Sequence, residues 1–377
     1  MKENHEIVLG NPTRAQRRDA FLDGRLVISS ARGVGGADRV LLDAFDQEIN
    51  GTALTVGSRE GLAALATATL WPDTVVHNFD LDAYDSQRAA KTARANQLGR
   101  VHFHLEADLP HGDYDWILMP IPRQGDAMLN GELLRQAFES LRQRGKLLVA
   151  TDNRKDKWLQ DRIREIFGAV TIYRQTRRGK VYIARKQSGR APRERDFRRT
   201  FPGRIFDQDL QLESRPGVFS HRRVDAGTKA LAEVAEISTG ATVVDLGCGS
   251  GALGIAAALA NPSGRSVLVD SNARAVAAAR ANVVRNGVKN GVVLLAYDLG
   301  AIEPASVEIV LANPPYFGDF RILEAFARAA ERVLKPAGTY YCVTKSPEVA
   351  VDICQRCFDR VELREQRGYV VLQCRNG

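Results

Sequence analysis

The chain has 377 residues, of which 44% are hydrophobic and 26% are charged. This composition is typical of a soluble globular protein, and the length allows two domains with a core in each. Residues 1–10 lack the apolar core of a signal peptide, and the longest small-apolar run, residues 251–260, is about half of a membrane span. We therefore expect a cytoplasmic protein without a membrane partner.

The first half alternates apolar runs with helical patterns. Helices are predicted from residue 59 and over 86–99, 128–143 and 154–167. The predicted strands are residues 51–57, 74–80, 113–122, 145–153, 169–175 and 180–186, with a further short strand possible around 102–104.

The second half repeats this rhythm with similar spacing. Helices are predicted after the first strand to about residue 260 and over 272–287, 322–338 and 346–357. The predicted strands are residues 241–247, 265–270, 291–298, 307–315, 339–345, 360–365 and 368–374.

Such alternation predicts a parallel sheet covered by helices on both faces. The connection before the last strand of each half is too short for a helix, so the final two strands should form an antiparallel hairpin. We therefore predict an α/β fold of two tandem Rossmann-like domains, each with a mostly parallel seven-stranded sheet. The predicted boundaries are a first domain over 1–186, a basic linker over 187–203 and a second domain over 204–377.

The positive charge is unevenly distributed. The formal net charge is +8, and residues 1–200 carry 33 Lys and Arg against 26 Asp and Glu, whereas residues 201–377 carry 20 against 19. Much of the excess lies between Arg174 and Arg199. Such a run is either a solvated face or a nucleic-acid contact, and its place beside the linker leaves both interpretations open.

A glycine-rich loop, DLGCGSG over residues 245–251, ends the first strand of the second half and opens a helix. Gly247, Gly249 and Gly251 allow a tight turn and let a ligand lie against bare backbone. Asp270 and Asp298 end the next two predicted strands, at the same edge of the sheet. Three strand ends therefore predict one ligand site.

This loop resembles the S-adenosylmethionine site of the class I methyltransferases, over essentially all of 240–374. The resemblance implies S-adenosylmethionine as the cofactor. It assigns cofactor binding to the following residues: Asp245, Gly247, Gly249, Gly251, Asp270 as the ribose acid, Asp298 as the adenine contact, and Asn313. Cys248 receives no catalytic role.

Asn313-Pro314-Pro315-Tyr316 ends the fourth strand of this half. In the class I family this tetrapeptide marks enzymes that methylate a planar nitrogen. The resemblance makes Asn313, Pro314 and Tyr316 catalytic: two oxygens accept the N–H groups of the amine, and the ring stacks on the planar group, a contact worth about 1–3 kcal/mol for a base. Positioning then provides most of the catalysis.

The duplicated layout is degenerate in its first copy, where TVGSREG (55–61) replaces the loop and MPIP (119–122) replaces the tetrapeptide. Together with PGVFS (216–220) and Asp225, this layout resembles the ribosomal RNA guanine-N2 methyltransferases, over nearly the whole chain. The resemblance implies transfer of a methyl group to a guanine N2 amine in ribosomal RNA. It also implies a non-catalytic, RNA-binding first domain.

The same resemblance implies ribosomal RNA, or an assembled or partly assembled ribosomal subunit, as the partner. It places Phe219, Tyr316 and Phe317 at the substrate. Two alternatives stay open: a glutamine-N5 methyltransferase that modifies a release factor or ribosomal protein, and a non-catalytic RNA-binding scaffold.

No metal site is expected from the sequence. Cys354 and Cys357 have no second pair nearby, and the five cysteines are an odd number that argues against a disulfide framework. His102 and His104 have ligand spacing on a possible strand, with His111 nearby, but no fourth ligand is evident.

Overall fold

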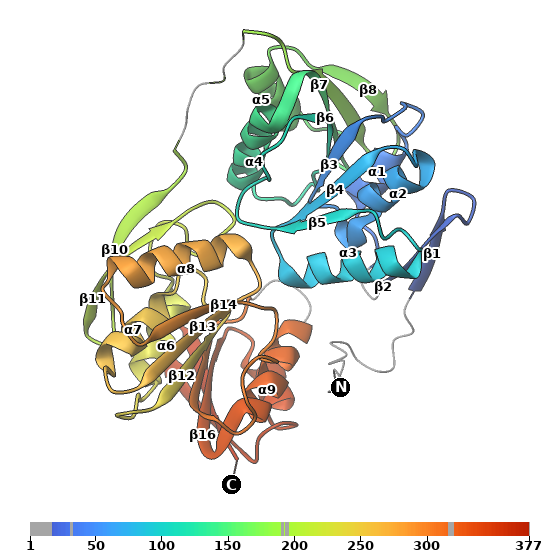
Figure 1. The fold of residues 1–377 in the computed structure, drawn as a ribbon. Coiled ribbons are helices and arrows are strands. Elements are labelled where there is room, and N and C mark those ends of the chain that lie inside the picture. The colour runs from blue at the N-terminus through green and yellow to red at the C-terminus, as the bar shows by residue number, and fades with distance from the viewer. Residues whose placement is uncertain (1–16, 31–32, 190–191, 193–195, 316–319, 377) are drawn as a thin grey trace. The chain divides into compact units, whose positions relative to one another are not determined.

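The computed structural model describes the chain apart from residues 1–16, 31–32, 190–191, 193–195, 316–319 and 377 (Figure 1). Two compact units divide between Phe197 and Arg198. We call residues 13–197 the N-terminal unit and residues 198–377 the C-terminal unit. The expected linker, 187–203, contains this division, and its last residues already belong to a strand that begins at Arg199.

The N-terminal unit is built on a seven-stranded sheet with the order β5-β4-β3-β6-β7-β9-β8. All pairs are parallel except β7–β9 and β8–β9. The strands are β3 (Thr52–Val56), β4 (Val75–Asp80), β5 (His102–Leu105), β6 (Tyr114–Pro120), β7 (Leu141–Thr151), β8 (Thr171–Gln175) and β9 (Lys180–Arg185).

In the described part of this unit, a separate hairpin, five α-helices and one short 3-10 helix accompany the sheet. The hairpin pairs β1 (Arg17–Phe21) with β2 (Leu26–Ser30). The helices are α1 (Gly36–Leu42), the short 3-10 helix η1 (Arg59–Gly61), α2 (Leu62–Leu70), α3 (Ala83–Ala95), α4 (Ala127–Ser140) and α5 (Trp158–Phe167), with η1 leading directly into α2.

The sheet of the C-terminal unit has the equivalent order, β14-β13-β12-β15-β16-β18-β17. Its last two strands again form an antiparallel hairpin. The strands are β12 (Thr242–Leu246), β13 (Arg265–Asp270), β14 (Gly291–Leu295), β15 (Val307–Ala312), β16 (Leu334–Thr344), β17 (Arg360–Gln366) and β18 (Tyr369–Arg375). The predicted tandem α/β architecture is thus confirmed.

The C-terminal unit also begins with a separate hairpin, of β10 (Arg199–Ile205) and β11 (Gln208–Ser214). Its helices are α6 (Ala226–Val234), α7 (Ala252–Ala260), α8 (Ala273–Arg285), α9 (Arg321–Val333) and α10 (Pro347–Cys354). No helix in the described part of the chain is long and apolar enough to cross a bilayer.

Alternating residues of each central strand enter different cores. In β12, Val243 joins the cluster that includes α6 and α7, whereas Val244 joins the cluster with α9 and α10. In β7, Leu147 faces α4 and α5, and Leu148 faces α1. Because both faces are covered, these strands are almost continuously apolar. The carboxyl ends of the strands are left as the polar edge of each sheet.

One predicted helix is shorter than expected. The helix predicted over 322–338 ends at Val333, and Lys335, Pro336 and Gly338 lie in β16 instead. Proline has no N–H to donate and disfavours a helical conformation at the preceding residue, so the helix ends before it. The following segment enters the sheet with an irregular register against β15.

Candidate functional site

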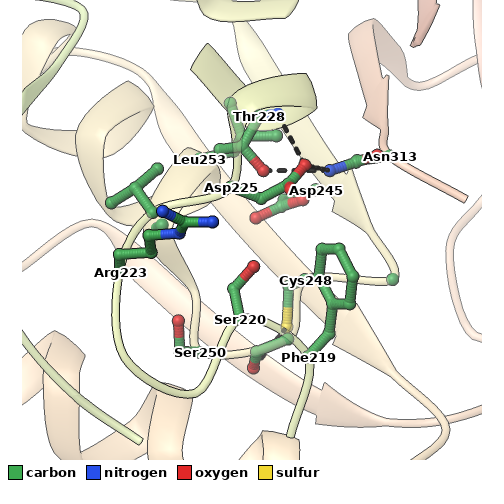
Figure 2. Close-up of a pocket in the computed structure, with 14 residues that line it drawn as sticks. Phe219, Ser220, Arg223, Asp225, Thr228, Asp245, Cys248, Ser250, Leu253 and Asn313 are labelled. Carbon is green, nitrogen blue, oxygen red and sulfur yellow. Dashed lines mark hydrogen bonds between the residues drawn. The ribbon is translucent and has the colours of Figure 1, made fainter. Parts of the chain in front are cut away.

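A pocket opens in the C-terminal unit at the carboxyl ends of β12 and β15 (Figure 2). It is lined by residues from three segments: the chain from after β11 into α6, the chain from β12 into α7, and the residue after β15. These are Phe219, Ser220, Arg223, Val224, Asp225, Thr228, Asp245, Gly247, Cys248, Gly249, Ser250, Ala252, Leu253 and Asn313.

The glycine loop forms the floor of this pocket. Gly247 and Gly251 have φ angles of 76° and 88°, which side-chain-bearing residues rarely adopt. A Cβ on Gly251 would also lie 3.0 Å from Cδ2 of Leu268, so the loop packs tightly on β13. The N–H of Gly247 donates to the carbonyl oxygen of Val269 at 2.8 Å. The resulting turn leads into α7 with bare backbone along the pocket.

Two carboxylates fix this loop. Asp245 is buried, and its Oδ2 accepts the N–H of Gly254 in α7 at 2.8 Å. Burial raises the pKa of Asp245 to about 7. Oδ2 of Asp270 accepts the N–H of Gly249, and Oδ1 accepts that of Asn272, both at 2.8 Å. A carboxylate oxygen can accept two hydrogen bonds, so this arrangement suits two vicinal hydroxyls.

Asn313 is held in one orientation beside the loop. Its Nδ2 donates to Oδ2 of Asp225 at 3.1 Å and to Oγ1 of Thr228 at 3.0 Å. Figure 2 shows this group opposite Phe219 and Cys248. Because both contacts are made by the amide nitrogen, the amide oxygen points away from Asp225 and Thr228. The side chain therefore presents an acceptor beside the glycine loop.

Asp225 also starts the helix that supports this contact. It is the N-cap of α6, where its Oδ2 accepts the N–H groups of Gly227 at 2.8 Å and Thr228 at 3.4 Å. An N-cap carboxylate satisfies N–H groups that the helix leaves unpaired. One oxygen thus joins the start of α6 to Asn313.

The segment between β11 and α6 carries Phe219, whose side chain is 47% exposed. Two residues of the α8 region hold this segment. Nη1 of Arg274, a fully buried guanidinium, donates to the carbonyl oxygen of Pro216 at 3.1 Å, and Nδ2 of Asn272 donates to that of Gly217 at 3.1 Å. An exposed ring on an anchored backbone is suited to stacking on a flat ligand.

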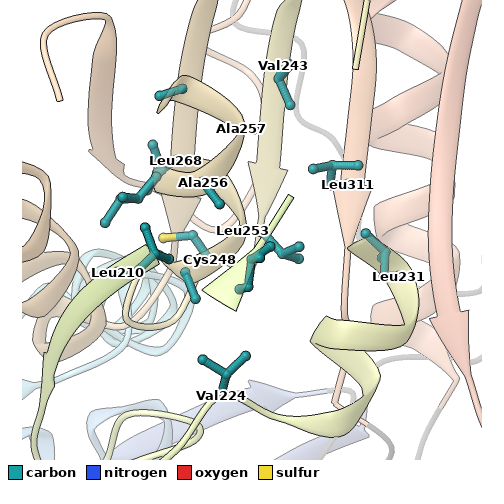
Figure 3. Packing of buried hydrophobic residues seen from close by; sticks show 14 of the residues in the cluster. Leu210, Val224, Leu231, Val243, Cys248, Leu253, Ala256, Ala257, Leu268 and Leu311 are labelled. Carbon is teal, nitrogen blue, oxygen red and sulfur yellow. The ribbon is translucent and has the colours of Figure 1, made fainter. Parts of the chain in front are cut away.

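Cys248 belongs to the core rather than to the chemistry of the pocket. It is 7% exposed and packs in the cluster around α7, where Figure 3 shows it among leucines. Burial raises the pKa of its thiol well above the ordinary value, and the nearby Asp270 and Asp245 raise it further. The thiol is therefore neither ionised nor reactive at neutral pH.

The remaining site predictions have different positions. Asp298 lies three residues beyond the end of β14, outside the set that lines the pocket, and its Oδ1 accepts the N–H of Gly300. Pro314 is buried directly after Asn313. Tyr316 and Phe317 lie outside the described residues. The structure thus brings the glycine loop together with Asp270 and Asn313, and it leaves Asp298 outside the lining of the pocket.

Three residues of the site escaped the sequence prediction: Thr228, Asn272 and Arg274. Asn272 occupies the N-cap position of α8, which the pattern Asp-Ser-Asn before an alanine-rich helix signals. An arginine in a helix gives no comparable signal, because its ordinary place is in solvent.

The corresponding loop of the N-terminal unit contains a buried glutamate that is paired with an arginine of α3. Glu60 is buried with a φ angle of 57° and accepts the Nε–H of Arg88 at 3.2 Å. Asp80 ends β4 as Asp270 ends β13, but it is 4% exposed and burial raises its pKa to about 8. Asp80 is thus more buried than Asp270, and its Oδ2 accepts a hydrogen bond from Nδ2 of Asn78 at 2.6 Å.

The chain matches a family model described as "Methyltransferase small domain" over residues 26–183 and again over 209–373. The two matches coincide with the two sheets. They include the glycine loop and Asn313 in the second match.

Curated relatives have ribosomal names. A "Ribosomal RNA large subunit methyltransferase G" of Pseudomonas syringae is 31% identical over 62% of this chain and 63% of its own length. A "Ribosomal RNA small subunit methyltransferase C" of Vibrio vulnificus is 30% identical over 52% of this chain and 56% of its own length. A large subunit methyltransferase G of Streptomyces avermitilis is 28% identical over 80% of this chain and 81% of its own length. The chain thus spans less than two thirds of the first two relatives.

A solved structure shares the whole fold. It is the 16S rRNA N2 methyltransferase RsmC of T. thermophilus, in complex with AdoMet and guanosine. The TM-score is 0.80 at 22% identity, and the match covers 96% of this chain and 98% of that chain. This likeness shows the fold alone.

Proposed function

The chain belongs to the methyltransferase small domain family, and from this premise we propose that it transfers a methyl group from S-adenosylmethionine to the exocyclic N2 amine of a guanine in ribosomal RNA. The names of the relatives support this substrate class. The observation that carries the proposal is the hydrogen-bonded Asn313, which lies beside the glycine loop and in the same pocket.

The residues of the pocket and of the strand ends around it suit this cofactor. We assign its binding to Asp245, Gly247, Gly249, Gly251, Asp270, Asp298 and Asn313. Two backbone N–H groups orient the Asp270 carboxylate, which suits a ribose with two adjacent hydroxyls. S-adenosylmethionine, when bound, supplies an activated methyl group on a sulfonium centre.

The catalytic task of this chain is to orient the amine. We assign it to Asn313, Pro314 and Tyr316, with Phe219, Tyr316 and Phe317 at the base. The fixed amide of Asn313 presents its oxygen, so an N–H of the guanine amine can donate to it. Accepting these hydrogens favours a pyramidal nitrogen, and positioning of this kind accounts for a large part of catalysis in transfer reactions.

The partner is ribosomal RNA, as such or in an assembled or partly assembled subunit, and the protein acts in the cytoplasm. The C-terminal unit contains the active site. The N-terminal unit binds RNA without catalysis. The buried Glu60, paired with Arg88, occupies its counterpart of the glycine loop and supports the absence of catalysis.

The test uses methyl-labelled S-adenosylmethionine with ribosomal subunits that lack the modification, naked ribosomal RNA and a release factor. Label is expected in RNA as N2-methylguanine after nuclease digestion. Asn313→Ala should lower the methylation rate by at least about 100-fold while cofactor affinity, measured by calorimetry, changes only a few-fold. Label in the release factor would instead show a glutamine methyltransferase. Full activity of Asn313→Ala would refute the role of the amide.

A further inference from the structure

A second hollow lies in the N-terminal unit, at the carboxyl ends of β6 and β7 and beside the turn between β8 and β9. Its lining residues are mostly basic: Arg123, Asp152, Asn153, Arg154, Lys155, Arg177 and Arg178. We call it the cationic pocket. Five cationic side chains surround one carboxylate there. The lining of the pocket in the C-terminal unit has one arginine, Arg223, and two aspartates, Asp225 and Asp245.

The cations of this pocket are largely without ionic partners. Within the described residues, only Arg178 makes an ion pair, with Asp43 at a long 3.9 Å. Other arginines of the same unit are paired with carboxylates at shorter distances, among them Arg39 with Asp19 at 3.1 Å and Arg164 with Asp161 at 3.0 Å. The pocket therefore concentrates positive charge that the protein itself does not neutralise.

The backbone around the pocket is well fixed. The N–H of Arg123 donates to Oδ1 of Asp152 at 2.7 Å, which ties the loop after β6 to the end of β7. A Cβ on Gly179 would overlap the carbonyl oxygen of Thr151, so the β8–β9 turn lies directly against the end of β7. Asp152 thus accepts a backbone hydrogen bond, and the arginine and lysine side chains extend from a backbone that is held in place.

Strand register assigns this pocket a counterpart in the other unit. Met119 pairs with Val149 in the same way that Ala312 pairs with Cys342. Each sheet also has a register irregularity near the start of the strand, at 114–116 in β6 and at 307–309 in β15. Counting onward, Pro120 takes the place of Asn313, so the sequence assignment of MPIP (119–122) was one residue too early. Arg123 then has the sequence position of Tyr316.

Like charges held together repel one another, and an anion that enters relieves this repulsion. Phosphate oxygens match guanidinium donors in geometry as well as charge. Ligands of open α/β sheets also bind outside the carboxyl ends of the strands. We propose that the cationic pocket binds backbone phosphates of the RNA substrate, with Arg123, Arg154, Lys155 and Arg177 as the contacts. This inference rests on the proposed function for the identity of the RNA.

The test compares two variants of the full chain with equal charge loss. The pocket variant is Arg154→Ala, Lys155→Ala and Arg177→Ala. The control variant is Arg142→Ala, Arg162→Ala and Arg164→Ala, whose arginines form ion pairs. Binding of a fluorescein-labelled ribosomal RNA fragment is measured by anisotropy at several salt concentrations. Melting curves and cofactor affinity verify that both variants are folded.

We expect the pocket variant to bind the fragment at least about 10-fold more weakly, and the slope of log K against log salt to fall by about 2. The control variant should change affinity less than 3-fold. Equal losses in the two variants, or no binding of the RNA by the unaltered chain, would overturn the inference. Pocket-dependent binding of phosphatidylglycerol vesicles in place of RNA would overturn it as well.

The two proposals fail separately. If labelled subunits are methylated and the pocket variant retains the RNA KM of the unaltered chain, the inference fails and the proposed function stands. If RNA binds through the pocket and no N2-methylguanine forms, the site stands and the proposed function fails.

Discussion

Asp225 shows how one side chain serves both stability and the site. Its Oδ2 caps α6 and also accepts Nδ2 of Asn313. The cap contributes about 1 kcal/mol to helix stability. The contact to Asn313 has a different consequence, because an amide free to rotate offers the target amine either a donor or an acceptor.

We predict that Asp225→Ala lowers the unfolding free energy by about 1 kcal/mol and lowers kcat of RNA methylation by at least about 10-fold. The cofactor affinity should change only a few-fold, since backbone N–H groups of Gly249 and Asn272, and not Asp225, orient the ribose acid Asp270. Denaturant titration, single-turnover kinetics and calorimetry measure the three quantities.

Thr228→Val is the matched control, because it removes one of the two contacts of Asn313 and leaves the carboxylate cap in place. Its effect on kcat should be smaller than that of Asp225→Ala, with stability nearly unchanged. A loss of stability without any change in kcat for Asp225→Ala would show that the residue is only a helix cap.

At the scale of residues, the sequence predicts those side chains whose type is dictated by the backbone conformation or by the end of a strand. Glycines of positive φ and an acid at the end of a strand are visible because few other residues serve those positions. In the structure Gly247 and Asn313 line one pocket, and Asp270 accepts the N–H of Gly249 from the same loop. Arg274 is not predictable, since its role is to reach the carbonyl oxygen of Pro216, 58 residues away in the sequence.

At the scale of elements, three histidines on neighbouring strands form a stack. His77 on β4 lies between His102 and His104 on β5, with ring centroids 4.9 and 5.1 Å away. Nδ1 of His77 is 2.8 Å from Nε2 of His104. The described residues contain no cluster of metal-binding geometry. The stack joins β4 and β5 at the edge of the sheet.

The low proton affinity of His77 in this stack makes the N-terminal unit less stable in acid. Burial and then the neighbouring His104 and His102 lower the pKa of His77 from its ordinary 6.5 to about 4. Between these pH values the unfolded chain binds a proton that the folded chain refuses, so the stabilising contribution is lost as pH falls from about 6.5 toward 4. Because His77 is partly exposed, we expect about 1 kcal/mol at pH 5 relative to pH 7.

His77→Gln removes the group that titrates, so comparison with the unaltered chain measures the contribution of His77 to the pH dependence. As pH falls from 7 to 5, the unaltered chain should lose more unfolding free energy than the variant does. Asp38 and Asp80, whose pKa values burial raises to about 7 and about 8, act in the opposite direction but equally in both proteins. A difference that stays constant with pH would contradict the expectation.

The elements themselves were largely predictable, and their ends were not. Alternating apolar runs and helices identify the order of strands, because both faces of the sheet are buried. Ends depend on local competition: β14 stops at Leu295 rather than at Asp298, and β15 stops at Ala312, before two prolines that cannot join the ladder.

At the scale of the whole molecule, each unit has separate cores. Only the C-terminal unit has the arrangement assigned to the cofactor. We therefore predict that S-adenosylmethionine at about 100 times its Kd stabilises the C-terminal unit by about 2.7 kcal/mol, a rise of about 5–10 °C in its Tm. The N-terminal unit should not respond.

Scanning calorimetry with and without the cofactor measures this, and backbone hydrogen exchange assigns the response to a unit. Asp270→Ala should abolish most of the shift. Protection of both units in equal measure would contradict the assignment of one cofactor site.

The overall architecture follows from the repeated pattern, so the duplication was visible in the sequence. The register that aligns Arg123 with the sequence position of Tyr316 was not visible, since it depends on which residues pair across β6 and β7. Strand register is set by three-dimensional packing, which a one-dimensional pattern does not specify.

The shared strand order creates a hazard during synthesis. Two stretches of one chain form sheets of the same topology. Each sheet also has the same register irregularity near the start of one strand pair, β6–β7 in the first and β15–β16 in the second. A nascent strand of one copy could therefore enter the sheet of the other, a known failure of tandem repeats. The copies differ in their central strands, with TALTV in β3 and TVVDL in β12. Divergence between the two copies thus protects the chain from exchanging its own parts.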